Sequence, residues 1–233
     1  MRNQRTDNMS RFLVIGITSL VALVVVAVVV ISNRPSQTDP ELLELVESLP
    51  KGVDEASGLP YIGEADAAVT MLIYEDLGCP NCRTYNLNVE PLVLRDYVLE
   101  GDVRIMIYTL AFVNQQSLPA AEGVMCAMDQ DEFWEYRDVV FNNQGVRAFN
   151  RESLIAFAEE VGLDMDAFVR CYDFGEHTEA ILERTNLALD FGITGTPTTE
   201  INGERHVGVL PFEQQGEQVG VSELIETALA ENQ

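Results

Sequence analysis

The sequence predicts an α/β domain in which a central β-sheet is flanked by helices and carries a helical insertion. Three observations support this prediction: a strand–helix–strand order between residues 68 and 110, a helical block after it, and a β-hairpin followed by a closing helix. Strands that alternate with helices form a sheet with helices on its faces. Hydrophobic residues make up 47% of the chain, so a sizeable core is available.

A long apolar run precedes this domain. The run from Phe12 to Ile31 contains no charged residue, and as a helix it would be about 30 Å long, the thickness of a bilayer's hydrocarbon core. A cleaved signal peptide is the alternative, but its apolar region is shorter, about 7–15 residues. We therefore expect residues 12–32 to form a transmembrane anchor. Residues 1–11 should be a cytoplasmic N-terminus, because three arginines precede the run: Arg2, Arg5 and Arg11.

Residues 33–66 are expected to form a linker with one short helix, since Asp39-Pro40 supplies a cap and a first-turn proline. The globular domain should then span residues 67–233, with its helical insertion at about residues 114–190.

The elements of that domain follow from local patterns. Residues 68–74 (AVTMLIY) and 103–110 (VRIMIYTL) are mostly apolar and predict two buried strands. A helix opened by Pro80 should join them and run to about Leu99.

The second half of the domain shows helical spacing of apolar residues, with glycines where helices should end. Asn202-Gly203 then predicts the tight turn of a β-hairpin, and residues 221–230 predict the closing helix.

The charge is strongly acidic. Acidic residues outnumber basic ones by 38 to 14, a net charge of −24, so neither nucleic acid nor an anionic lipid surface is an expected partner. With the N-terminus in the cytoplasm, the domain after the anchor is expected to be exported, to a compartment where disulfides persist. The domain holds an even set of cysteines: Cys79, Cys82, Cys126 and Cys171.

The strongest chemical signal is the motif Cys79-Pro80-Asn81-Cys82, which follows a buried strand and opens a helix. This placement is typical of a redox-active pair. The free N–H groups and the positive dipole of the helix N-terminus stabilise a thiolate at Cys79. Cys82, one turn later, is close enough to resolve a mixed disulfide.

Two other interpretations of the motif compete with this one. A zinc site would need a second CxxC or a histidine pair, whereas the other cysteines are isolated and His177 and His206 stand alone. We therefore expect no metal and no organic cofactor. A purely structural Cys79–Cys82 bridge is the second alternative.

The strand–CPNC–helix unit, the helical insertion and Gly195-Thr196-Pro197 before a hairpin resemble the DsbA-like branch of the thioredoxin superfamily. The resemblance covers roughly residues 60–230 and implies a thioredoxin-like fold. It implies that Pro197 is a cis-proline facing the cysteines, with Thr196 beside it in the substrate cradle. The residues alone allow Pro197 to be a strand-start proline with an ordinary trans bond.

The sequence departs from the family's pattern at one position. Members of this branch often carry a buried acid six residues before the first cysteine, thought to shuttle protons for the second, and here that position is Ile73. Glu75 and Asp76 are nearer the motif and are candidate proton relays. They could equally be solvated loop acids.

For Cys126 and Cys171 the resemblance suggests a structural disulfide. Closing that loop of about 46 residues would contribute on the order of 4 kcal/mol in the chain-entropy model. Two buried free thiols, or a relay pair that exchanges with Cys79, are the alternatives.

The sequence therefore predicts a single-pass membrane protein whose extracytoplasmic domain exchanges disulfides with protein substrates. We expect an oxidant, which requires a membrane redox partner for recycling. The alternatives are a reductase or isomerase with the same site, or a non-catalytic binding module or chaperone of thioredoxin fold.

Overall fold

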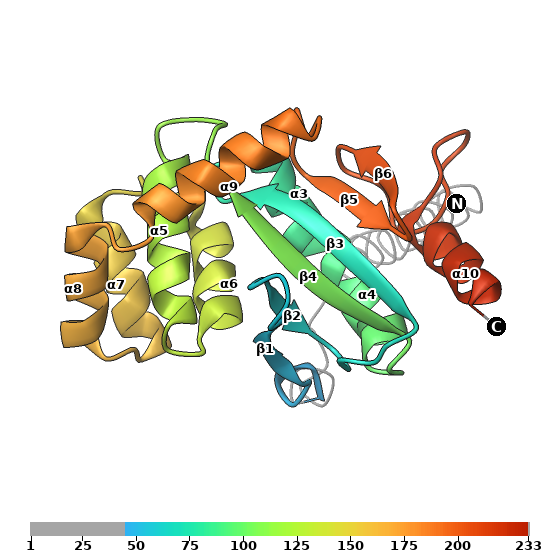
Figure 1. The fold of residues 1–233 in the computed structure, drawn as a ribbon, viewed down its shortest axis with the longest axis horizontal. Coiled ribbons are helices and arrows are strands. Elements are labelled where there is room, and N and C mark those ends of the chain that lie inside the picture. Colours follow the sequence, from blue (N-terminus) through green and yellow to red (C-terminus); the bar gives the residue numbers. More distant parts are fainter. Residues whose placement is uncertain (1–44, 233) are drawn as a thin grey trace, which may run out of the picture. The chain divides into compact units, whose positions relative to one another are not determined.

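The structure, a computed structural model, describes residues 45–232. Their core is one six-stranded β-sheet with strand order β1-β2-β4-β3-β5-β6 (Figure 1). The strands are β1 (Lys51–Val53), β2 (Pro60–Ile62), β3 (Val69–Asp76), β4 (Val103–Leu110), β5 (Thr198–Ile201) and β6 (Glu204–Val207). The helices are α3 (Pro80–Asn88), α4 (Glu90–Val93), a π-helical turn η1 (Leu94–Val98), α5 (Ser117–Met128), α6 (Phe133–Asn143), α7 (Arg151–Val161), α8 (Met165–Phe174), α9 (Thr178–Asp190) and α10 (Val221–Glu231).

The two predicted buried strands form the centre of the sheet. β3 and β4 are parallel and in register from Val69 opposite Val103 to Asp76 opposite Leu110. One face packs its side chains, such as Ile73, into the main core together with residues of α4 and α10. The other face buries a smaller cluster that includes Leu110 and Ala188 of α9. Because both faces are covered, these strands need the largely apolar sequence from which they were predicted.

The predicted hairpin is present, and its position in the sheet determines where the loop before β5 lies. Asn202 and Gly203 both have positive φ, 50° and 82°, as the favoured two-residue hairpin turns require. β5 is antiparallel to β3, with Thr198 opposite Tyr74. The residues just before β5 therefore lie beside the end of β3 that leads to the cysteine motif.

The prediction that residues 33–66 are a linker is wrong from Lys51 onward. Residues 45–47 are helical, in agreement with the short helix expected there, but β1 and β2 extend the sheet on the β4 side. Tertiary bonds to α6 hold them: Trp134 Nε1 donates to the carbonyl of Tyr61 (3.2 Å), and Lys51 pairs with Glu135. Strands of three residues are too short to show an alternating pattern.

The single helix expected from Pro80 to about Leu99 is divided into α3, α4 and η1. Pro91 explains the break between α3 and α4, because it lacks an N–H and its ring clashes with the carbonyl of the preceding turn. It stands in the first turn of α4, where a proline is tolerated.

The predicted helical insertion is present as α5 to α8, which pack against one another on one side of the sheet (Figure 1). The helices between β4 and β5 end with α9 at Asp190, close to the expected boundary, but α9 differs from the other four in its packing. α9 starts against α5, but its end packs on the sheet, where Ala188 and Ile193 join Tyr74 and Leu110.

No helix within residues 45–232 combines the length and the apolar character needed to cross a bilayer. The predicted anchor at residues 12–32 and the predicted cytoplasmic residues 1–11 lie outside the described residues.

Candidate functional site

The motif lies where a parallel strand passes into a helix. Cys79 is the N-cap of α3, with extended backbone (φ −84°, ψ 120°), and Pro80 opens the helix. Cys82 follows one turn into α3. Both cysteines are free thiols, and their residues are 6% and 2% exposed. The helix N-terminus therefore directs its unpaired N–H groups at Cys79, while Cys82 is enclosed.

The two thiols have opposite electrostatics. The pKa of Cys79 is lowered to about 5, mainly by a hydrogen bond from Cys82, with further bonds from Thr196 and from the backbone of Asn81 and Cys82 outweighing the effect of burial. The pKa of Cys82 is raised far above its ordinary value, first by burial, then by its bond to Cys79 and by the charge of Glu75. At neutral pH the reduced pair therefore consists of a Cys79 thiolate and a Cys82 thiol.

The loop before β5 faces the motif. The Thr196–Pro197 peptide bond is cis, and the backbone oxygen of Thr196 lies 3.3 Å from Cys79 Sγ. Thr196 and Pro197 are both buried. The fold thus brings together Cys79 and the Thr-Pro segment, which are more than a hundred residues apart in sequence.

Asp76 organises the loops around the motif. Its carboxylate accepts hydrogen bonds from three backbone N–H groups: those of Gly78 (2.7 Å), Phe112 (2.8 Å) and Val113 (2.9 Å). Asp76 is fully buried, so these bonds compensate for its desolvation. They also tie the segment after β4 to the approach to Cys79.

Two amide side chains that sequence analysis missed complete this loop. Asn114 Nδ2 donates to the carbonyl of Gly78 (2.7 Å), and Gln144 Nε2 donates to the carbonyls of Leu77 (2.7 Å) and Cys79 (3.2 Å). A Cβ at Gly78 would lie 2.6 Å from Ser117 Oγ. Nothing in the spacing of these amides marks them in the sequence, because each acts through the backbone of a distant segment.

Glu75 lies on β3 on the same face as Ile73, because side chains two residues apart in a strand point the same way. Both are buried, at 2% and 1% exposure. The interpretation of Glu75 and Asp76 as solvated loop acids is therefore wrong. Position 73, where the resemblance implies a buried acid, is isoleucine, and Glu75 is a buried acid on the same face two residues nearer the cysteines.

Glu75 has two charged neighbours that sequence analysis also missed. Arg137 of α6 donates to both Glu75 oxygens, each at 2.7 Å, and to both oxygens of Glu90, again at 2.7 Å. A faint signal existed: Arg137 stands one turn after Phe133 and one position after Tyr136, so a charge lies on the apolar side of a helix.

The second pair of cysteines is joined in the structure. A disulfide connects Cys126 of α5 to Cys171 of α8, the pairing that the resemblance suggested. Both residues are buried, at 1% and 6% exposure. Within residues 45–232, both clusters of potential metal ligands include Cys171. A sulfur bonded to another sulfur is not the thiolate that a metal would need.

These features define a class of protein. A dithiol at the N-terminus of a helix, after the central parallel strand of a mixed sheet and opposite a cis-proline, is the site of a thioredoxin-like dithiol protein.

Comparison with known proteins agrees with this class. A thioredoxin family model matches residues 55–220, so the chain belongs to this family, and it is a DsbA-like thiol–disulfide oxidoreductase. It is 27% identical over 149 residues to the probable disulfide bond formation protein D of Bacillus anthracis, covering 61% of this chain and 69% of that protein. The fold is similar to that of oxidised BdbD from Bacillus subtilis (TM-score 0.66, 21% identity, 78% of this chain and 98% of that one). It is also similar to alpha-DsbA1 from Wolbachia pipientis (TM-score 0.62, 20% identity, 76% and 93%).

Proposed function

We propose that this chain oxidises thiols of exported proteins to disulfides through Cys79 and Cys82. The observation that carries the proposal is the position of Cys79 at the N-terminus of α3, facing the cis Thr196–Pro197 bond. The Cys82 side chain and the backbone there lower the pKa of Cys79 to about 5. A thiolate stabilised at neutral pH stabilises the reduced enzyme, and a stabilised reduced form makes the disulfide a stronger oxidant. The similarity to the probable disulfide bond formation protein D of Bacillus anthracis supports the same direction.

The oxidation of a substrate takes two exchange steps. A substrate thiolate attacks Cys79 Sγ of the Cys79–Cys82 disulfide, a mixed disulfide forms, and Cys82 leaves with the electron pair and takes up a proton. A second substrate thiolate then attacks the substrate sulfur of the mixed disulfide. The substrate disulfide forms and Cys79 leaves as a thiolate, so two electrons have passed from substrate to enzyme. Thr196 and Pro197, facing Cys79, form the cradle for the substrate backbone.

Recycling reverses these steps against a disulfide supplied by a membrane redox partner. The Cys79 thiolate attacks the partner's disulfide, and Cys82 must then lose its proton before it attacks Cys79 Sγ. We assign Glu75 as the group that exchanges this proton. Cys82 Sγ accepts a hydrogen bond from the N–H of Asp76 at 3.5 Å, so the sulfur lies at the peptide that follows Glu75. Asp76 itself is occupied by three backbone N–H groups and serves the loops.

The proposal includes a location and a role for the second disulfide. The apolar run at residues 12–32 anchors the chain, and the cysteine-bearing domain faces the extracytoplasmic side, where disulfides persist. The Cys126–Cys171 disulfide covalently links α5 to α8, stabilises the fold and takes no part in turnover.

The reduction potential of the Cys79–Cys82 couple tests the direction of electron flow. A value near about −120 mV in equilibrium with glutathione supports an oxidant, whereas one near about −270 mV means a reductant. Trapping assigns the roles of the cysteines: Cys82→Ser should accumulate mixed disulfides with a reduced unfolded protein, and Cys79→Ser should not. Faster alkylation of Cys82 than of Cys79 would reverse the assignment.

A further inference from the structure

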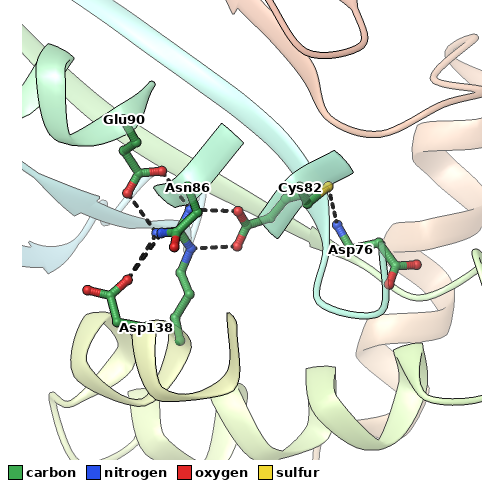
Figure 2. Close-up of polar contacts among 7 residues, drawn as sticks. Asp76, Cys82, Asn86, Glu90 and Asp138 are labelled. Carbon is green, nitrogen blue, oxygen red and sulfur yellow. Dashed lines mark hydrogen bonds and ion pairs between the residues drawn. The ribbon is translucent and has the colours of Figure 1, made fainter. Parts of the chain in front are cut away.

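A buried cluster of charges lies directly behind Cys82. It joins Arg137 of α6, Glu75 of β3 and Glu90 of α4, whose side chains are only 1%, 2% and 4% exposed. All four carboxylate oxygens accept a bond from the guanidinium, two from each edge. Figure 2 shows Glu90, Asn86 and Asp138 on one side of the cluster and the sulfur of Cys82, turned to the backbone of Asp76, on the other.

The cluster has an unbalanced charge. Among the ion pairs of residues 45–232, Arg137 is the sole cation paired with Glu75 or Glu90. The rings of Trp134 and Phe141 lie 5.4 and 5.2 Å from its guanidinium and help to exclude water. Two carboxylates against one guanidinium leave one net negative charge in a dry interior, where such a charge is costly. The cluster becomes neutral when one carboxylate binds one proton.

The two carboxylates differ in what they face. Cys82 Sγ accepts a hydrogen bond from the N–H of Asp76, the residue that follows Glu75 in β3, and the charge of Glu75 is among the causes that raise the pKa of that thiol. Burial raises the pKa of Glu75 itself, and the nearby charge of Glu90 acts in the same direction, while Arg137 opposes both. Glu90 lies on the side of Asp138, whose own side chain is 59% exposed and 3.8 Å from Arg137. The exchangeable proton therefore belongs on Glu75.

We infer that Glu90 is a positioning residue: by serving as the second counter-ion of Arg137, it leaves Glu75 free to take and return the proton of Cys82. The inference rests on the proposed role of Glu75. An arginine paired with one carboxylate holds that carboxylate ionised. With Glu90 on the other edge, a protonated Glu75 leaves a neutral Arg137–Glu90 pair.

The proton transfer balances without a change in net charge. The proton moves from Cys82 Sγ to a Glu75 oxygen, and the new thiolate attacks Cys79 Sγ of the mixed disulfide. The Cys79–Cys82 bond forms as the bond from Cys79 to the other sulfur breaks, and that sulfur leaves with the electron pair. The titratable and charged groups around Glu75 are those of α3, α4 and α6: Cys79, Cys82, Tyr85, Glu90, Arg137 and Asp138.

The test starts from the full-length protein with a mixed disulfide already formed between Cys79 and a thiol. Its resolution is measured as the release of that thiol in a single turnover, at a series of pH values. In the wild type the rate should rise with pH to a plateau as Glu75 ionises. Glu75→Gln should slow release on the order of a hundredfold at neutral pH and remove the plateau. Glu90→Gln should move the midpoint at least one unit lower in pH and lower the plateau, because Glu75 becomes a weaker base.

Matched variants separate this effect from damage to the fold. Glu122→Gln makes the same change at another buried glutamate, which binds the start of α9, and should leave the profile unchanged. Arg137→Lys keeps one cation between the two acids and should retain a plateau. An unshifted midpoint in folded Glu90→Gln overturns the inference about Glu90, whereas an unchanged rate in Glu75→Gln overturns the proposed relay itself.

If Glu90→Gln does not fold, carboxyl carbon NMR of the wild type decides. Glu75 should titrate above about 4.3, the ordinary value for a glutamate. An ordinary or lowered pKa at Glu75 means that Arg137 holds it ionised despite Glu90, and the inference is wrong.

Discussion

Cys82→Ala isolates the largest contribution to the reactivity of Cys79. The Cys82 side chain is the first cause of the lowered pKa of Cys79, about 5. Hydrogen bonds to charged groups contribute about 1.5–3 kcal/mol, and one pKa unit corresponds to about 1.4 kcal/mol. Loss of this bond should therefore raise the pKa of Cys79 by about one to two units. At pH 7 the thiolate fraction would fall from about 99% to between about 50% and 90%.

The assay is the ultraviolet absorbance of the Cys79 thiolate followed against pH, with the rate of alkylation as an independent readout. Cys82→Ser is the matched control, because its hydroxyl keeps a donor at the same position, and its pKa should rise less than that of the alanine variant. An unchanged pKa in Cys82→Ala would refute the reasoning. The backbone N–H groups at the start of α3 and the Thr196 side chain would then account for the stabilisation.

Three further predictions follow from the geometry. Above pH 5 the reduced protein holds an ionised Cys79, whereas Cys82 keeps its proton because its pKa is raised. Reduction of the disulfide therefore takes up one proton for two electrons, and the reduction potential should fall by about 30 mV per pH unit. A slope of about 60 mV per pH unit would mean two ordinary thiols. The Cys126→Ser/Cys171→Ser double variant should lose about 2–5 kcal/mol of unfolding free energy yet keep most turnover, and lost turnover at unchanged stability would favour the relay alternative. Gly78→Ala puts a Cβ 2.6 Å from Ser117 Oγ and should slow alkylation of Cys79 in protein that still melts cooperatively; wild-type reactivity would show that the loop tolerates the shift.

The parts of the fold that could be predicted from the sequence are those whose cause is local. The apolar runs of β3 and β4 reflect burial on both faces, and Asn202-Gly203 reflects the positive φ angles that its turn requires. β1 and β2 could not be predicted from the sequence, because a strand of three residues is too short to show an alternating pattern. Bonds to α6 stabilise them. The break at Pro91 could have been predicted, since a proline rarely continues a helix.

The site divides in the same way. Cys79 and Cys82 could be placed from the strand and helix around them, because the helix terminus itself supplies the chemistry. The burial of Glu75 follows from the two-residue period of a strand: Ile73 is buried, so Glu75 faces the same side. Its partner Arg137 could not be identified in this way, because the contact between α6 and the end of β3 depends on tertiary packing.

Helix α6 makes the helical insertion part of the active site. Arg137 extends from its middle to the acid behind Cys82, and Gln144 at its end donates to the backbone of Cys79. Without the insertion, Glu75 and Glu90 would be two buried carboxylates with no cation, an arrangement that costs several kcal/mol unless one of them is protonated. A Glu75 that stayed protonated throughout the working pH range could not accept the proton of Cys82. The insertion therefore contributes to the protonation of the thiol pair, and its position relative to the sheet should affect the chemistry as directly as the residues of the motif.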